Sequence, residues 1–131
     1  MLTNLVWVRP NIMNSFKTFF ILALLSILFS NCNIGNIKEK ANKQFGDQHF
    51  KTAIALIELH KVRFGEYPPS LDSIKYAGDW DFAIRTSVKY ERLDNGYKLD
   101  LVNGWIGKPT TLEYPEDFWY GLGLIESNMK K

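Results

Sequence analysis

An uncharged apolar run near the N-terminus, followed at once by the chain's only cysteine, constrains this protein more than any other feature. The run covers residues 19–29, with Lys17 just before it and Cys32 just after it. A helix needs about 20 apolar residues to span a bilayer, so this run is too short. A short apolar core with a positive flank is typical of a secretory signal peptide. We therefore expect residues 13–31 to direct export.

The residues around the cysteine resemble a known processing site. Phe29-Ser30-Asn31-Cys32 is similar to a relaxed lipobox, the cleavage site of bacterial lipoproteins, although Phe29 replaces the usual Leu and Asn31 the usual Gly or Ala. The resemblance implies cleavage before Cys32 and attachment of diacylglycerol to its sulfur. It further implies a location at the cell membrane or outer membrane, facing the periplasm or the exterior. The alternative is an uncleaved anchor followed by a buried free cysteine.

The rest of the chain divides into segments around this signal. Residues 1–12 show no functional pattern, and Met13 begins a natural signal sequence, so we interpret 1–12 as a mis-assigned start. Residues 32–46 should hold the lipidated cysteine, a polar tether at 33–36 and a first helical segment. We expect residues 47–131 to form a single α+β domain. A single cysteine excludes an intramolecular disulfide.

Charge argues against one class of partner. Two of the 16 Lys and Arg residues precede Cys32, which leaves 14 to match the 14 acidic residues, all of which follow it. The part after the signal is therefore neutral and contains no basic run. A nucleic-acid-binding protein needs a basic face to neutralise phosphates, so we expect no nucleic acid among the partners.

Residues 37–64 show the periodicity of an amphipathic helix. Its apolar stripe consists of Phe50, Ala53, Ile54, Ile57 and Phe64, widened by Leu56 and Leu59. Gly46-Asp47 should interrupt the helix, with Asp47 as the N-cap of the second half. Gly65 is a C-cap candidate, and Pro68-Pro69 forbid continuation. One more helical turn could follow at residues 70–74.

A β-hairpin is expected at about residues 86–102. Residues 88–92 and 97–101 alternate in polarity, and Asn95-Gly96 between them favours a type I′ turn. This turn pairs Tyr90 with Leu101, and it also sets Glu91 unfavourably against Asp100. Val88, Tyr90, Leu99 and Leu101 then share the face that covers the helix.

The C-terminal part gives weaker signals. Residues 110–114 could form a third strand. Pro115-Glu116-Asp117 is a good helix start, so we expect a short helix over residues 115–120 that ends at Gly121 and Gly123.

The order of these elements resembles the head domain of a pilin or type II secretion pseudopilin. The motif is Gly65-Glu66-Tyr67-Pro68-Pro69-Ser70-Leu71 between a long helix and the Tyr97-Lys98-Leu99 strand, and the similarity covers about residues 47–102. It implies a long N-terminal helix packed on a small antiparallel sheet. The filament function does not carry over, because the apolar run lacks the glutamate used in assembly. Gly104–Gly107 also lacks the carboxylates of the family's calcium loop.

Few residues are candidates for catalysis or for binding a metal ion. His49 and His60 are eleven positions apart, about three helical turns, and cannot share a metal ion. Asp79-Trp80-Asp81 could bind a cation or a sugar, but such a segment is more often a turn with a core tryptophan. Glu116-Asp117 is explained by helix initiation. We therefore expect no catalytic residues, no metal and no cofactor.

Three hypotheses on function remain. The first is a lipid-anchored, non-catalytic binding or assembly module for an envelope protein, with Trp80, Trp105, Trp119 and Tyr120 as its interaction patch. The second is a small envelope hydrolase that uses carboxylates such as Asp79, Asp81 and Glu116. The third is an accessory factor of a secretion or pilus-like system, which rests on fold analogy alone.

Overall fold

The computed structural model describes residues 17–24, 34–109 and 112–130. The chain divides into two compact units, Met1–Ile34 and Gly35–Lys131, which are described separately. In the first unit, residues 17–24 are helical, and most of their side chains are exposed. Cys32 and the lipobox-like segment lie outside the described residues, as do residues 1–16.

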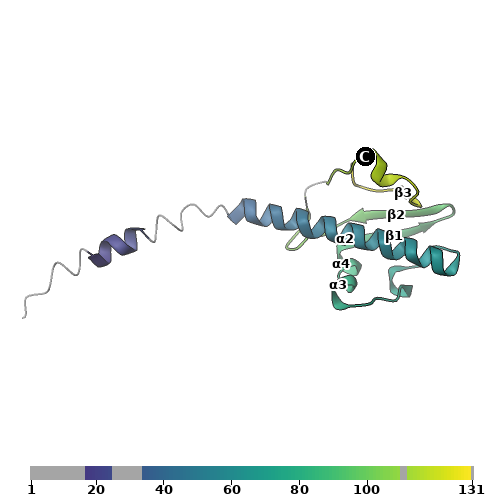
Figure 1. Ribbon diagram of the computed structural model, residues 1–131, viewed down its shortest axis with the longest axis horizontal. Helices are drawn as coiled ribbons and strands as arrows, with labels where there is room; N and C mark the ends of the chain where they lie inside the picture. Colours follow the sequence, from purple (N-terminus) through teal and green to yellow (C-terminus); the bar gives the residue numbers. More distant parts are fainter. Residues whose placement is uncertain (1–16, 25–33, 110–111, 131) are drawn as a thin grey trace, which may run out of the picture. The chain divides into compact units, whose positions relative to one another are not determined.

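The long helix α2 spans Ile34–Phe64 without interruption (Figure 1). The expected break and N-cap at Gly46-Asp47 are therefore wrong. Gly46 serves packing instead, because a Cβ there would lie 3.0 Å from the Leu101 side chain. Asp47 pairs with Lys51 one turn further on, at 2.9 Å. The glycine thus brings the helix close to the sheet and does not end it.

The buried face of α2 follows the expected stripe along most of its length. Phe50, Ala53, Ile54 and Ile57 are all buried. Phe64 was expected on the same stripe, but it is 67% exposed and its ring packs on His60. At this end of the core Tyr67, from the following loop, packs against Tyr97 with 5.2 Å between ring centres. The expectation of a polar tether at residues 33–36 is also wrong, because α2 already begins at Ile34.

After α2 the chain turns back through short helical pieces. Gly65 has a φ of +80°, and its N–H donates to the Lys61 carbonyl at 2.8 Å, which confirms the predicted C-cap. The 3₁₀ turn η1, Leu71–Ser73, lies where one more turn was expected. Two four-residue helices follow, α3 at Asp79–Phe82 and α4 at Ile84–Ser87.

The hairpin consists of β1, Val88–Leu93, and β2, Gly96–Leu101. Its antiparallel register pairs Tyr90 with Leu99 and Glu91 with Lys98. The expected pairing of Tyr90 with Leu101 is therefore wrong by two residues. Because side chains alternate with a period of two, this shift leaves every residue on its expected face. It also replaces the repulsion between Glu91 and Asp100 with an attractive pair.

The turn differs from the predicted type I′ for a tertiary reason. Asp94 and Asn95 form the loop, and among the described residues only glycines have a positive φ, so a type I′ turn is excluded. Gly96 is the first residue of β2. A Cβ on Gly96 would lie 2.2 Å from the Gly123 carbonyl oxygen. Gly96 is therefore needed where the C-terminal segment crosses the strand.

The third strand is β3, Leu124–Glu126, and it pairs with β2 in parallel. The sheet order is β1-β2-β3, so the sheet is mixed and the expectation of an antiparallel sheet is wrong. The expected strand at 110–114 is reduced, in its described part, to a bridge between Glu113 and Lys130. The 3₁₀ helix η2, Glu116–Trp119, lies in the expected place, and Gly121 follows it with a φ of +76°.

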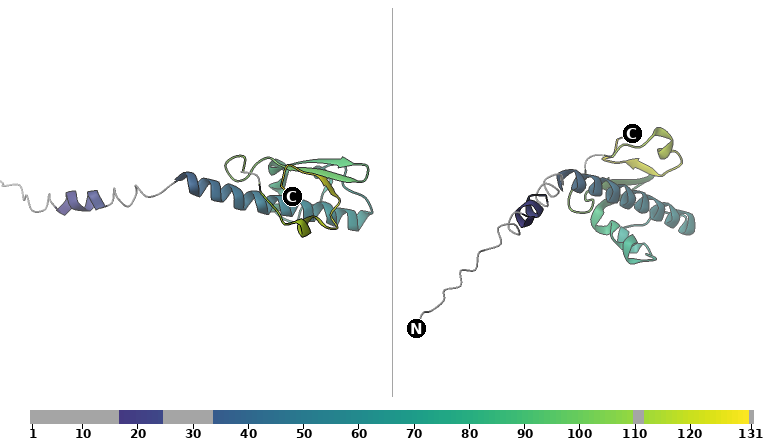
Figure 2. Two further views of the ribbon diagram at one scale, coloured as in Figure 1. Left: turned by 90° about the horizontal axis from the view of Figure 1, so that it is seen from above. Right: turned by 60° about the vertical axis from the view of Figure 1, so that its left-hand side comes forward.

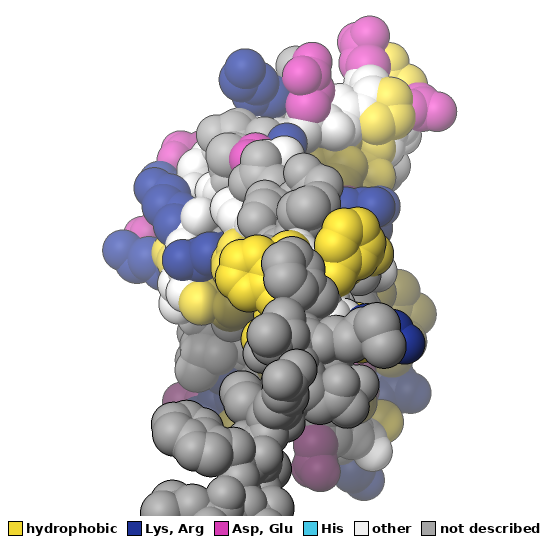
Figure 3. Space-filling model, turned by 90° about the vertical axis from the view of Figure 1, so that its left-hand side faces the viewer, with side chains coloured by type: hydrophobic (Ala, Val, Ile, Leu, Met, Phe, Trp, Pro, Cys, Tyr) yellow, Lys and Arg dark blue, Asp and Glu magenta, His cyan; other side chains and the backbone are white. Residues whose placement is uncertain are grey.

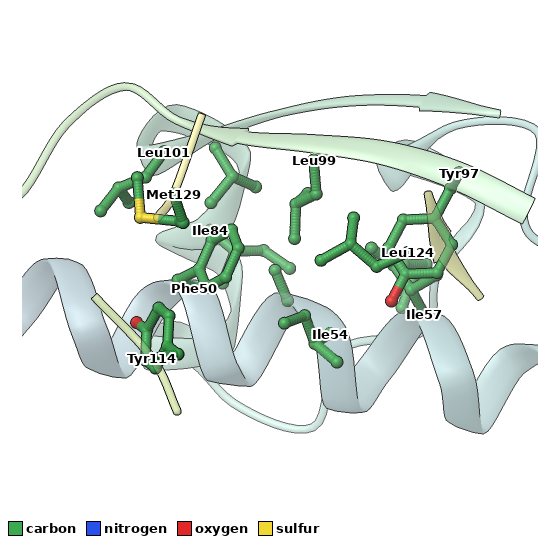
Figure 4. Packing of buried hydrophobic residues seen from close by; sticks show 13 residues of the cluster. Phe50, Ile54, Ile57, Ile84, Tyr97, Leu99, Leu101, Tyr114, Leu124 and Met129 are labelled. Atoms are coloured by element: carbon green, nitrogen blue, oxygen red, sulfur yellow. The ribbon is translucent and has the colours of Figure 1, made fainter. Parts of the chain in front are cut away.

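The unit has an α+β architecture, in which α2 lies along one face of the three-stranded sheet (Figure 2). Helices α3 and α4 lie at the β1 edge, and the C-terminal segment lies at the opposite edge. Figure 4 shows Phe50, Ile54 and Ile57 of α2 facing Leu99 and Tyr97 of β2 across the core. Burying each such side chain stabilises the fold by about 1.5–3 kcal/mol.

Candidate functional site

The four aromatic residues of the predicted interaction patch lie on separate parts of the unit. Trp80 on α3, Trp105 in the loop after β2 and Tyr120 after η2 are 72%, 60% and 70% exposed. Trp119 is half-buried and packs in the core, 6.5 Å from the Phe50 ring. Trp105 packs against Phe45 with the two rings tilted by 30° and 5.8 Å between ring centres. The three exposed rings are not in contact with one another.

The loop that carries Trp105 is fixed to the N-terminal part of α2 by one buried side chain. The Asn42 Oδ1 accepts the backbone N–H groups of Trp105 at 3.0 Å and Ile106 at 2.8 Å. Gly104 allows this contact, because a Cβ there would lie 2.5 Å from the Asn42 carbonyl oxygen. We call this arrangement the Asn42 latch. No local pattern distinguishes Asn42 from a surface asparagine, so the latch cannot be predicted from the sequence.

A second polar junction, centred on Glu58, ties α2 to the sheet and the C-terminal segment. The Glu58 Oε1 accepts the Tyr97 hydroxyl at 3.0 Å and the Gly123 N–H at 2.7 Å. The Tyr67 hydroxyl donates to Oε2 at 3.5 Å. Burial, followed by the Glu58 charge and hydrogen bond, raises the pKa of Tyr97 above its ordinary range. Glu58 therefore acts as a structural acceptor for three segments of the chain.

The two histidines differ in their surroundings. His49 is buried on α2, its Nδ1 lacks a hydrogen-bond partner, and burial lowers the pKa of its imidazole. His60 is half-buried, and its ring contacts Phe64. In the part of the chain that the structure describes, no three His, Cys, Asp or Glu side chains form a group suited to a metal ion.

The carboxylates proposed for a hydrolase do not converge. Asp79 and Asp81 lie on α3, at the β1 edge, whereas Glu116 lies on η2, at the opposite edge (Figures 1 and 2). Trp80, between the two aspartates, is exposed, so the interpretation of this segment as a turn with a core tryptophan is wrong. Glu116 therefore does not share an element or an edge with the two aspartates, which lie two residues apart on α3.

Two hollows lie elsewhere on the surface. The larger, about 450 Å³ and open, is lined by Lys98, Asp100, Ile125, Glu126, Ser127, Asn128 and Met129. Its charged groups already have partners: Lys98 pairs with Glu126 at 3.3 Å, and Asp100 accepts the Asn128 N–H at 2.9 Å. The smaller, about 70 Å³, lies between the end of α2 and Ile74. Asp79, Asp81 and Glu116 line neither of these two hollows.

The surface and the helices give two further findings. On the face shown in Figure 3, Lys and Arg side chains intermix with Asp and Glu, which agrees with the balanced charge after Cys32. Among the described residues, every helix is too short or too polar to cross a bilayer.

Comparisons with known proteins complete the description of the unit. Protein-family models, curated proteins and solved structures give no significant match to this chain. A functional assignment must therefore come from the residues and their arrangement.

Proposed function

We propose that this chain is a lipid-anchored protein of the cell envelope, and that its 35–131 unit is a non-catalytic binding or assembly module for another envelope protein. One observation carries the proposal. The only cysteine, Cys32, follows an apolar run of signal-peptide length and directly precedes the folded unit, because α2 begins at Ile34. A lipid on Cys32 would therefore attach where the fold begins, with almost no intervening chain.

The way in which the unit uses its polar groups supports binding rather than catalysis. Glu58 joins three segments, and Glu66 and Asp72 pair with Arg92 and Arg85. The acids of the hydrolase hypothesis are spread over two edges. The exposed aromatic rings, in contrast, are available to a partner, and tryptophan and tyrosine are enriched where proteins bind one another.

The fold also leaves open the narrower proposal of an accessory role in a secretion or pilus-like system. A long helix followed by a hairpin agrees with the order of elements in a pseudopilin-like head. The parallel pairing of β3 departs from the antiparallel sheet that the resemblance implies. Co-purification of secretion components with the native protein would support this role, and their absence at native expression would contradict it.

The anchor is tested by the intact mass of the protein purified from its host's membranes. We expect a chain that begins at Cys32 and carries a diacylglyceryl group. Two acyl chains give stable anchoring, since each buried CH₂ contributes about 0.8 kcal/mol. The variant Cys32→Ser should keep the mass of the uncleaved precursor, whereas the control Ser30→Ala, which keeps a small residue in the motif, should be processed normally. A wild-type protein without lipid would contradict the proposal.

A further inference from the structure

An uncovered apolar surface lies at the N-terminal end of α2, which we call the end collar: Ile37, Phe45, Trp105 and Ile106. Ile37 is 55% exposed and Ile106 is 56% exposed, and Phe45 lies under the Trp105 ring. Ile37, Ala41 and Phe45 are four residues apart, so they continue the apolar face of the helix along one line. On this line, Phe45 is half-buried and Ile37, nearer the start of the helix, is exposed.

The end collar is rigid rather than a loose loop. The Asn42 latch fixes the backbone of Trp105 and Ile106 to the helix by two hydrogen bonds. The Gly104 N–H also donates to the Gly107 carbonyl at 2.7 Å, which closes the loop on itself. A fold that holds large apolar side chains in water at fixed positions indicates a binding surface.

The charges at this end are mainly positive. Lys38, Lys40 and Lys43 lie on the exposed sides of α2, and Lys108 follows the collar loop. The acidic residue among them, Glu39, pairs with Lys43 at 3.4 Å. Tryptophan with nearby lysines suits the boundary of a bilayer, where the indole lies at headgroup depth and the ammonium groups meet anionic lipids.

The chain itself indicates which surface the end collar meets. Ile37 is five residues after Cys32, and five extended residues span at most about 18 Å. A lipid on Cys32 would therefore keep the end collar close to the bilayer. We propose that the end collar is a second, non-covalent membrane contact, which inserts Trp105 and Ile106 at headgroup depth and sets the orientation of the domain. This inference rests on the proposed lipid anchor.

The test uses the full chain, purified from its host's membranes and placed in vesicles of phosphatidylcholine and phosphatidylglycerol with brominated acyl chains. Bromine quenches tryptophan fluorescence at short range. We expect the lipid to quench the wild-type protein, and Trp105→Phe to lose most of that quenching. The matched control, Trp80→Phe, removes an equally exposed ring from α3 and should keep the quenching. Equal quenching in the two variants, or none in the wild type, overturns the proposal.

Two readouts separate this proposal from its alternatives. Lipid found on Cys32 by mass, together with no quenching through Trp105, overturns the end collar and leaves the anchor standing. Absence of lipid overturns the anchor, and the end-collar proposal fails with it. Sedimentation in detergent tests a second copy as the occupant. A dimer that Trp105→Phe dissociates, with no lipid quenching, would make the end collar an interface between copies and overturn the membrane contact.

Discussion

Two buried tyrosine hydroxyls illustrate how differently one residue type can act in this core. The Tyr97 hydroxyl donates to the Glu58 carboxylate at 3.0 Å, whereas the Tyr114 hydroxyl is buried without a hydrogen-bond partner. Burial raises the pKa of both phenols, and in each case a nearby carboxylate, Glu58 or Asp47, raises it further. Both hydroxyls lose hydrogen bonds to water when they are buried. Only the Tyr97 hydroxyl replaces them with a hydrogen bond inside the protein.

This difference predicts unequal effects for the same substitution. Tyr97→Phe should lower the free energy of unfolding by about 1.5–3 kcal/mol, the range for a hydrogen bond to a charged group. Tyr114→Phe should cost less than Tyr97→Phe, because the Tyr114 hydroxyl has no hydrogen-bond partner within 3.5 Å and Asp47 is only a neighbouring charge. Urea unfolding followed by circular dichroism measures both. Equal losses in the two variants would show that the Glu58 bond contributes nothing specific.

At the scale of the elements, the sheet depends on the contact of β2 with the C-terminal segment. The Tyr97 N–H donates to the Gly123 carbonyl at 2.9 Å, next to Gly96. Glu58 holds the same segment through the Gly123 N–H. Gly123 therefore connects the C-terminal segment to both β2 and α2 by hydrogen bonds.

Gly96→Ala should disturb this connection. The new Cβ would lie 2.2 Å from the Gly123 carbonyl oxygen, so the segment must move away, and overpacking of this kind costs about 1–3 kcal/mol. We expect lower stability and faster hydrogen exchange at Leu124–Glu126. Gly107→Ala is the control, because a Cβ there meets no atom within 4 Å. If the two variants were equally stable, the close crossing at Gly96 would not be needed.

The hairpin and α2 show which structural features a local sequence pattern predicts and which it does not. Alternation placed Val88, Tyr90, Leu99 and Leu101 on the inner face, and the structure confirms that assignment. Alternation cannot distinguish registers that differ by two residues, so the turn preference of Asn95-Gly96 misled the prediction of pairs. Similarly, a glycine in a helical pattern predicts a break when its packing partner is unknown.

At the scale of the whole molecule, buried titratable groups set the pH range of greatest stability. Burial lowers the pKa of His49 from 6.5, so below that pH the unfolded chain binds more protons and stability falls. Burial raises the pKa of Tyr90 from 10.0 to about 12, with Arg92 opposing the rise. Between these values the unfolded chain loses the proton first, so stability falls as the pH rises.

We therefore expect a plateau of stability between about pH 6.5 and pH 10. Each fully buried tyrosine, such as Tyr97, should add a slope of about 1.4 kcal/mol per pH unit above pH 10. Urea unfolding from pH 5.5 to pH 11 measures the profile. His49→Leu should flatten the acidic side. An unchanged acidic side in His49→Leu would assign that loss to other groups.

Features that depend on neighbours along the chain can be predicted from the residues alone. These are the balanced charge after Cys32, the stripe from Phe50 to Ile57, the C-cap at Gly65 and the inner face of the hairpin. Each follows from a period or from the conformational preference of one residue.

Other features depend on contacts between distant segments. These are the parallel third strand, the continuity of α2 through Gly46, the Asn42 latch and the dispersal of the exposed aromatic rings. The physical reason is distance along the chain. The latch joins Asn42 to Trp105, and the Glu58 junction joins Glu58 to Gly123. The free energy of such contacts depends on which distant segments meet, and no local pattern contains that information.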